Sequence, residues 1–385
     1  MYKLYIMNYI YNIIEFTYNY IKYIILNICI YFNCCHIYRN KLKYDGFDFK
    51  VFHQHTNMKA RRGIIYTPHG NIHTPAFIFC ATKASMKSTT IDNVIKNNTQ
   101  IILSNTYHLF LKGTDTIKSL GGLHKALGFN KPMLTDSGGY QVFAMNFQGV
   151  SSDIKGSKNR VFKPTFISTN ENGSKFRSYY NMETIELTPE KSIQTQMDLG
   201  ADIILAFDEC TSSTISKEQT RLSTELSHRW EKRSLDYFLN NKHKSEHKQV
   251  LYGIVQGGIY KDLRKTSCDF INNNPFFGIA VGGCLGTNSQ EMYDTVNYTM
   301  NNLVQDRPVH LLGIGYLRDI FNGVKQGIDT FDCVHPTRVG RHGYAFVPAK
   351  YLVTNKEKEK NFIDISKSKF NNINKPIYDE CKCTT

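Results

Sequence analysis

Cysteine is too sparse in this sequence for a fold held together by disulfides. The 385 residues include ten cysteines, at positions 29, 34, 35, 80, 210, 268, 284, 333, 381 and 383. Small secreted domains instead concentrate their cysteines in short chains. The spacing therefore excludes a secreted disulfide framework and predicts a reducing, cytoplasmic location.

The sequence also lacks a long, uninterrupted apolar run. Its most apolar stretch, Tyr23 to Cys35, is broken by Asn27 and Asn33, and it is short for a membrane span, which needs about 20 residues. We interpret residues 1–58 as a leader or extension. Three origins stay open for it: an organelle-targeting signal, a loose membrane anchor, or extra residues from a start codon assigned too far upstream.

Acidic residues are in deficit. Lys and Arg number 47 against 33 Asp and Glu, which gives a formal net charge of +14. On a folded body such a charge favours a polyanionic partner such as nucleic acid. A merely basic, soluble protein is the alternative, because part of the charge lies in the tails.

From about Lys59 the chain alternates short β-rich apolar runs with stretches that can hold helices. Apolar runs such as Ile203 to Phe207 suit parallel strands that are covered on both faces. The pattern predicts an α/β fold, a (β/α)8 TIM barrel over residues 59–355, with a doubly wound sheet carrying an inserted domain as the alternative. The eight candidate strands are Pro75 to Ala81, Ile101 to Asn105, Met133 to Ser137, Ala201 to Glu209, Gln249 to Gly257, Phe277 to Gly283, His310 to Gly315 and Thr330 to Val334.

Two connecting segments have a clear local pattern. Ser216 and Gln219 form a capping-box spacing, and the stripe Leu222, Leu226 and Trp230 that follows predicts a helix packed on the core. Residues 148–181 are long and polar, which predicts an elaborated loop after the third barrel strand. Loops at that position lie over the active face of a barrel.

Polar residues and glycines gather where the candidate strands end. Singly, an Asp after a strand is commonly a helix cap and a glycine pair is commonly a turn. Their repetition at five strand ends instead indicates a pocket for a flat ligand rich in hydrogen-bonding groups, because the carboxyl ends of barrel strands form the active site. These residues are Asp136, Asp208, Gln256, Gly282, Gly283 and Asp332.

Several motifs around these positions, taken together, are specific. From about Arg61 to Cys383 the chain resembles the tRNA-guanine transglycosylase family, with residues 1–58 and 148–163 unmatched. The matching motifs are Gly70-Asn-Ile-His-Thr-Pro-Ala76, Asn105-Thr-Tyr-His-Leu109, Gly121-Gly-Leu-His124, Leu134-Thr-Asp-Ser-Gly-Gly-Tyr-Gln141, Leu187-Thr-Pro-Glu190, Phe207-Asp-Glu-Cys210, Gly253-Ile-Val-Gln-Gly257 and the segment Asp332 to Gly343.

The resemblance implies a TIM-barrel pentosyltransferase that replaces the guanine at the anticodon wobble position of tRNA. It makes Asp332 the nucleophile and Asp136 the general acid/base, while Arg338 and Arg341 match the stretch that holds the tRNA backbone and a neighbouring base. The ring of Tyr140 is expected to stack on the base. The other expected base-binding residues are Ser137, Asp208, Cys210, Gln256, Gly282 and Gly283.

This chemistry needs two carboxyl groups. Displacing a base from C1′ of ribose builds oxocarbenium character, which a carboxylate on the opposite face can stabilise or trap. The departing base takes up a proton and the incoming base loses one, which requires a second, acid/base group. Two other interpretations stay open: a barrel glycoside hydrolase, which also uses paired carboxylates, and a non-catalytic partner subunit of a heterodimeric transglycosylase.

The resemblance also implies a structural zinc site of Cys-x-Cys-x-x-Cys followed by a histidine. Cys381 and Cys383 match its first half, and two ligands are fewer than the four of a closed zinc site. We therefore expect residues 356–385 to be the start of a zinc-binding subdomain, in a truncated gene product. The family's homo- or heterodimeric assembly is expected with it.

The incoming base is predicted from one loop. After Gly282-Gly283 the chain has Cys284-Leu285-Gly286, and the small Gly286 resembles the eukaryotic pattern that makes room for queuine. Phe207-Asp-Glu-Cys210 instead resembles bacterial enzymes, which use the smaller precursor prequeuine. We expect queuine, with prequeuine as the alternative.

Overall fold

The computed structural model describes residues 42–144, 165–348, 350, 352, 361–371 and 375–381. The chain divides into two compact units, Met1–Lys43 and Tyr44–Thr385. The architecture below is that of the second unit. Within the described part of the chain, no helix is both long and apolar enough to cross a membrane.

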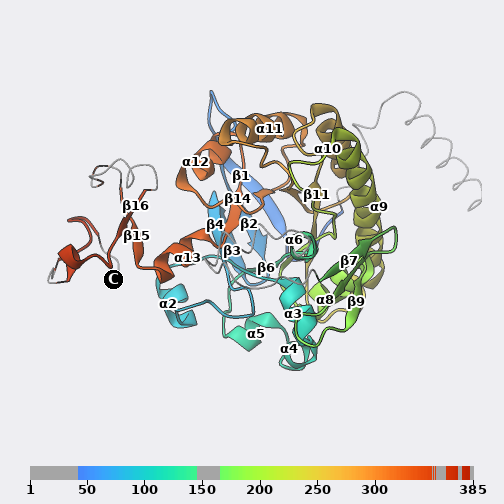
Figure 1. The fold of residues 1–385 in the computed structure, drawn as a ribbon, viewed down its shortest axis with the longest axis horizontal. Helices are drawn as coiled ribbons and strands as arrows, with labels where there is room; N and C mark the ends of the chain where they lie inside the picture. Colours follow the sequence, from blue (N-terminus) through green and yellow to red (C-terminus); the bar gives the residue numbers. More distant parts are fainter. Residues whose placement is uncertain are drawn as a thin grey trace, which may run out of the picture. The chain divides into compact units, whose positions relative to one another are not determined.

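Eight parallel strands close into a barrel, and the helices α8 to α12 lie in a ring around it (Figure 1). Each predicted strand is present, with shorter bounds except that the strand predicted from His310 begins one residue earlier, at Val309, and the predicted TIM-barrel class is confirmed. Closure is made by β14, which pairs with β4 from Thr330↔Ala76 to Cys333↔Phe79. The barrel strands are β4 (Ala76–Cys80), β5 (Ile102–Ser104), β6 (Met133–Thr135), β10 (Ile203–Leu205), β11 (Val250–Val255), β12 (Gly278–Val281), β13 (Val309–Leu311) and β14 (Thr330–Cys333).

The apolar runs are buried on both sides, as the sequence pattern indicates. All residues of β10, β11 and β12 are buried, since side chains on one face fill the barrel and those on the other meet the helices. The helices are α2 (Ile91–Lys96), α3 (Thr106–Lys112), α4 (Asp115–Ser119), α5 (Leu123–Leu127), α6 (Gly139–Ala144), α8 (Pro189–Leu199), α9 (Lys217–Asn241), α10 (Lys261–Asn273), α11 (Ser289–Asn302), α12 (Leu317–Lys325) and α13 (His335–Arg341).

The capping box at the start of α9 is present. Ser216 Oγ accepts the Gln219 backbone N–H at 3.2 Å, and Gln219 Oε1 accepts the Ser216 backbone N–H at 3.2 Å. The core stripe is only partly correct. Trp230 is fully buried, but Leu222 is 52% exposed, because the first turns of α9 bury the face that carries Thr220, Ser223 and Thr224 instead.

Two small antiparallel sheets lie outside the barrel pattern. The first consists of β1 (Asp48–Gln54), β2 (Arg61–Thr67) and β3 (Gly70–Thr74), so residues 48–54 of the expected leader pair with a strand that leads into the barrel. The second consists of β7 (Phe166–Thr169), β8 (Ser174–Arg177) and β9 (Thr184–Leu187). The expected loop over residues 148–181 is thus wrong where β7 and β8 lie, and residues 145–164 lie outside the described part.

A tight turn explains why this second sheet forms in so polar a segment. Asn170 accepts the Asn172 N–H on its side chain at 2.8 Å, and its own N–H donates to Gly173 O at 3.0 Å. The turn brings β7 against β8, and Phe176 and Leu187 of the neighbouring strands are fully buried. Two inward apolar residues in a polar background give little alternation, and so the segment resembles a loop in sequence.

A buried ion pair ties the first sheet to the end of the barrel. Arg61 Nη2 lies 2.5 Å from Asp329 Oδ2, with side-chain exposures of 1% and 0%. The other guanidinium nitrogen, Nη1, donates to Gln305 O at 2.6 Å. Asp329 directly precedes β14, so this pair anchors the strand that closes the barrel.

Arg61→Met is expected to destabilise the protein by about 3 to 5 kcal/mol, because it leaves the Asp329 carboxylate buried without its counter-charge. Urea denaturation followed by circular dichroism would measure the loss. Arg221→Met is the matched control, since Arg221 pairs with Glu218 and Glu225 on the surface of α9, and it should leave the midpoint in place. An unchanged midpoint for Arg61→Met would show that the pair does not anchor the closing strand.

The remaining described elements follow the barrel. Strands β15 (Tyr344–Phe346) and β16 (Phe362–Asp364) form a hairpin, and its Ile363 packs with Val347 and Leu352 in a small separate core. Two 3-10 helices, η1 (Lys242–Lys244) and η3 (Ser368–Phe370), complete the set.

Candidate active site

The strand-end residues predicted from the sequence meet at the carboxyl end of the barrel. Asp136 follows β6, Asp208 follows β10 and Gln256 follows β11, while Asp332 lies within β14. The side chains of Ser137 and Gln256 both donate to Asp208, and the charge of Asp332 acts on Asp136. The structure therefore brings both proposed catalytic carboxyl groups and the proposed base-reading groups into one site.

Asp136 is held from α3. Its Oδ1 accepts the Thr106 backbone N–H at 2.7 Å, its Oδ2 accepts the side-chain amide of Asn105, and Gln141 is a third donor. Burial raises the pKa of this carboxyl to about 7, with the neighbouring Asp332 adding to the rise and the three donors opposing it. A carboxyl with this pKa can both give and take a proton at neutral pH.

Asp208 forms the centre of a second network. Gln256 Nε2 donates to its Oδ2 at 2.6 Å and Ser137 Oγ donates to its Oδ1 at 3.3 Å. Burial raises the pKa of Asp208 to about 6, against the lowering effect of these two hydrogen bonds. At pH 7 the carboxyl is therefore mostly ionised, an acceptor suited to the N–H edge of a purine.

Glycines give this network its room. A Cβ on Gly282 would lie 2.9 Å from Gln256 Nε2, and one on Gly283, whose φ is +55°, would overlap Gln256 Oε1. A Cβ on Gly139 would lie 2.5 Å from Asp208 O. A larger residue at any of these three positions would displace Gln256 or Asp208.

Asp332 is held mainly through its Oδ1. Its Oδ1 accepts the Gly313 backbone N–H at 2.9 Å and lies 3.2 Å from His310 Nε2. The thiol of Cys80 lies 3.9 Å from Oδ2, and burial raises the pKa of that thiol well above its ordinary value, so it stays protonated. Oδ2 accepts only this weak hydrogen bond from the thiol, so it is the oxygen that can meet a substrate.

Sequence reasoning missed the residues that hold these carboxylates. Asn105 and Thr106 stand in a quoted motif but were given no role. His310 is fully buried. A histidine within an apolar strand is a signal in the sequence that could have identified it as a functional residue. Gly313 and Cys80 carry no such signal, because a backbone donor and a buried thiol look like ordinary turn and core residues.

The other expected ligand contacts lie around this centre. Tyr140 on α6 is 50% exposed, so its ring can accept a stacked base, and burial of the remaining part raises the pKa of its hydroxyl. Cys210 is partly buried close to Asp208, and burial raises the pKa of its thiol. Arg338 and Arg341 lie on α13, which begins three residues after Asp332, and Arg341 is exposed.

The expected zinc ligands are only partly within the described residues. Cys381 is partly buried in segment 375–381, and Cys383 lies outside the described residues. Two thiolates do not complete a four-ligand zinc site, so no catalytic step is assigned to the metal.

Outside this site, two histidines and an aspartate, all residue types that can ligate a metal ion, lie close together. The ligand atoms of His69, His124 and Asp202 lie within 4.8 Å of one another. The two imidazoles are stacked at 3.6 Å and each contacts a different oxygen of Asp202, at 2.7 and 3.0 Å. Burial alone would raise the pKa of Asp202, but the hydrogen bonds from both histidines lower it. The stacked rings do not point their nitrogens at one ion. The two histidines instead hold the Asp202 carboxylate, which directly precedes β10.

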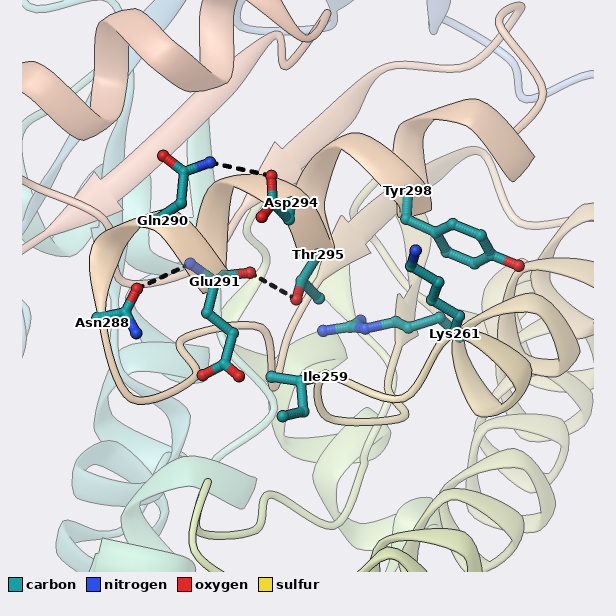
Figure 2. A pocket seen from close by; sticks show the side chains of 9 residues that line it. Ile259, Lys261, Asn288, Gln290, Glu291, Asp294, Thr295 and Tyr298 are labelled. Atoms are coloured by element: carbon teal, nitrogen blue, oxygen red, sulfur yellow. Dashed lines mark hydrogen bonds between the residues drawn. The ribbon is translucent and has the colours of Figure 1, made fainter.

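A cavity of about 350 Å³ lies between α10 and α11 (Figure 2). Lys261, Glu291 and Asp294 are among its lining residues. None of the predicted site residues lines it, so it lies outside the strand-end site.

Gly286 lies in a loop that packs against the start of α11. Its φ is +60°, and a Cβ there would lie 2.5 Å from Glu291 Oε2. That same oxygen accepts the Thr287 N–H at 2.6 Å. The backbone conformation and the contact with Glu291 both favour glycine here, and the room expected for queuine stays a prediction.

Comparisons with known proteins agree with this geometry. The family model described as Queuine tRNA-ribosyltransferase matches residues 56–385. A Queuine tRNA-ribosyltransferase of Protochlamydia amoebophila is 40% identical over 323 residues, covering 83% of this chain and 82% of the relative. Proteins of the same name from Roseiflexus sp. (41% over 315 residues, covering 78% of this chain and 77% of the relative) and Chlamydia caviae (42% over 297 residues, 77% of each) are similar. The resemblance to tRNA-guanine transglycosylases is confirmed, and the chain belongs to the queuine tRNA-ribosyltransferase family of pentosyltransferases.

Proposed function

We propose that this enzyme exchanges the wobble guanine of a tRNA anticodon for queuine by double displacement. The observation that carries the proposal is the meeting of two carboxyl groups at one barrel end, one of them with a pKa raised to about 7. A group that titrates near neutral pH serves as proton carrier, and its partner is free to act as nucleophile.

In the first displacement Asp332 Oδ2 attacks C1′ of the ribose. The bond from C1′ to N9 of guanine breaks, an ester between Asp332 and C1′ forms, and the departing base receives the proton of Asp136. In the second displacement the incoming base gives its proton to Asp136 and its nitrogen attacks C1′, which releases Asp332. Two inversions retain the configuration at C1′, and Asp136 ends in its starting protonation state.

Asp208, Gln256 and Gly283 are the proposed base-reading groups, with Tyr140 stacking on the ring and Ser137, Cys210 and Gly282 lining the pocket. An ionised Asp208 accepts from the N–H edge of guanine. A target base must leave its stack to reach a barrel mouth, and cationic contacts to phosphates offset part of that cost. We assign those contacts to Arg338 and Arg341.

Two assembly features are part of the same proposal. Cys381 and Cys383 are assigned to the family's structural zinc site, as two of its ligands. The protein is proposed to act as a homo- or heterodimer with a second transglycosylase subunit. Neither feature enters the displacement steps above.

Incubation with radiolabelled guanine tests the reaction class. The enzyme should incorporate label into tRNA that has guanine at the wobble position, and a tRNA with another base there is the control. A glycoside hydrolase would instead release sugar from an oligosaccharide and leave the tRNA unlabelled. A non-catalytic subunit would bind tRNA without any exchange.

Queuine is expected to displace labelled guanine from tRNA at a lower concentration than prequeuine does. The proposal rests here on the resemblance of Cys284-Leu285-Gly286 to eukaryotic enzymes, while Phe207-Asp-Glu-Cys210 favours prequeuine. Loss of label over a titration of each base, on the same prelabelled tRNA, would measure the preference. A lower concentration requirement for prequeuine would assign the chain to the bacterial-type reaction.

A further inference from the structure

Helix α10 holds the peptide that precedes Gln256 from both ends. Arg264 Nη1 donates to Val255 O at 3.0 Å, and Ser267 Oγ accepts the Gln256 backbone N–H at 3.0 Å. The two side chains are three residues apart and therefore lie on one face of the helix. The backbone that carries Gln256 is thus fixed from outside the barrel.

The same guanidinium reaches the next strand. Arg264 Nη2 donates to Gly282 O at 2.6 Å and Nε donates to Gly258 O at 2.8 Å. Its side chain is fully buried. One planar group therefore connects the ends of β11 and β12, the two strands that carry the proposed base-reading groups Gln256 and Gly283.

This contact fixes the direction of the Gly283 N–H. In a planar trans peptide the carbonyl and the N–H of the next residue point in opposite directions. Arg264, on the helix side of the barrel wall, binds the carbonyl of the Gly282–Gly283 peptide. The N–H of Gly283 accordingly points away from α10, toward the side on which Gln256 and Asp208 lie.

Burying the Arg264 guanidinium costs hydration free energy, so the need to fill space does not explain why this residue is an arginine. Burial lowers the pKa of Arg264 below its ordinary value, since a buried cation loses its hydration. Its hydrogen bonds go to three backbone carbonyl oxygens, which offset this loss only in part. An apolar side chain would fill the same space without that loss, but it could not orient two strand ends at once.

We propose that Arg264 is a positioning residue that sets base discrimination by aiming the Gly283 N–H at the carbonyl group of the bound purine. The inference rests on the proposed function, since it assumes that a guanine-like base occupies the strand-end site. A backbone donor aimed in this way pairs with a ring carbonyl and rejects a purine that lacks it.

Competition against labelled guanine in wild-type enzyme tests the aim of this donor. Unlabelled guanine and 2-aminopurine, which lacks the 6-carbonyl, are compared by their inhibition constants. Because 2-aminopurine also lacks the N1–H that would donate to Asp208, wild type should bind it at least about 100-fold more weakly, the range for two lost hydrogen bonds. Only the part due to the 6-carbonyl depends on the Gly283 N–H. Arg264→Lys, which loses the fork of donors, should reduce that ratio by about tenfold.

Three further measurements make the outcome specific. Hypoxanthine keeps the 6-carbonyl, so its ratio to guanine should be the same in wild type and Arg264→Lys. Arg307→Lys is the matched control, because Arg307 also donates to backbone carbonyls, of Ile271 and Asn274, but outside the site. Ser267→Ala, a smaller change, should lower the 2-aminopurine ratio by about threefold and serves if Arg264→Lys does not fold.

An unchanged 2-aminopurine ratio in every Arg264 and Ser267 variant that folds would overturn the inference. An equal shift in Arg307→Lys would overturn it as well, because the effect would then not depend on the strand ends. Failure of the proposed function is distinguishable, since wild type would then incorporate no labelled guanine into tRNA.

Discussion

Asp332→Asn is expected to abolish both turnover and the covalent complex with tRNA. Wild-type enzyme incubated with tRNA, and without a replacement base to complete the exchange, should form a complex that survives denaturation. An amide in place of the carboxylate is a poor nucleophile, and loss of a nucleophile lowers kcat by a factor on the order of 10⁴ to 10⁶. Denaturing gel electrophoresis with end-labelled tRNA would show the complex as a shifted band.

The hydrogen bonds around Asp332 make Asn a conservative replacement. Its side-chain oxygen can still accept the Gly313 N–H, which now binds Oδ1 at 2.9 Å, so the fold of β14 should be kept. Binding of tRNA by Asp332→Asn, measured by filter retention, is the control. A shifted band in this variant would mean that another residue is the nucleophile, and Asp136 would be the first to test.

Asp136→Asn should lower turnover by a factor on the order of 10² to 10⁴, the usual contribution of general acid/base catalysis. The amide cannot pass a proton to the departing guanine. The variant should still bind tRNA through Arg338, Arg341 and the basic surface, because these contacts do not involve Asp136. Steady-state guanine exchange and a separate tRNA-binding titration would measure the two effects.

The raised pKa of Asp136 gives this prediction a pH signature. The group is protonated below about pH 7 and ionised above it, and the first displacement needs the protonated form. The rate of covalent complex formation should therefore fall about tenfold per unit above pH 7. Asp136→Asn should lack this fall, because the group that titrates is gone.

A fall of the same size in Asp136→Asn would assign the titration to a different group. Asp208, whose pKa burial raises to about 6, would not be that group. It would give the opposite trend. Ionised Asp208 is the form that accepts the N–H edge of the base, so its titration makes activity rise as the pH passes 6. The sign of the slope thus separates the two carboxyl groups.

The barrel could be predicted because parallel strands that are buried on both faces appear in the sequence as continuous apolar runs. Runs such as Val250–Val255 are wholly buried and need no alternation to be recognised. The small antiparallel sheets have a weaker apolar pattern. In β1, six of seven positions are exposed, so its pairing with β2 depends on the turn and on the anchor at Arg61 and not on an apolar face.

The residues of the site could be predicted from the sequence, but the hydrogen-bond donors that hold them in place could not. Asp136, Asp208 and Gln256 follow strands that are easily placed, and the resemblance supplied their expected roles. The donors that tune them come from distant positions: Thr106 lies 30 residues from Asp136 and Ser137 lies 71 from Asp208. The loop at Gly286 is another case, since its contact with Glu291 depends on a side chain five residues further along the chain.

The closing strand of the barrel has a consequence for how the protein is made. Asp332 pairs with Ile78 in the β14–β4 ladder, so the proposed nucleophile stands on the last barrel strand to leave the ribosome. Until it arrives, β4 and β13 are open edges that can pair with another chain and seed aggregation. Activity and protection from aggregation therefore begin with the same event, the docking of β14.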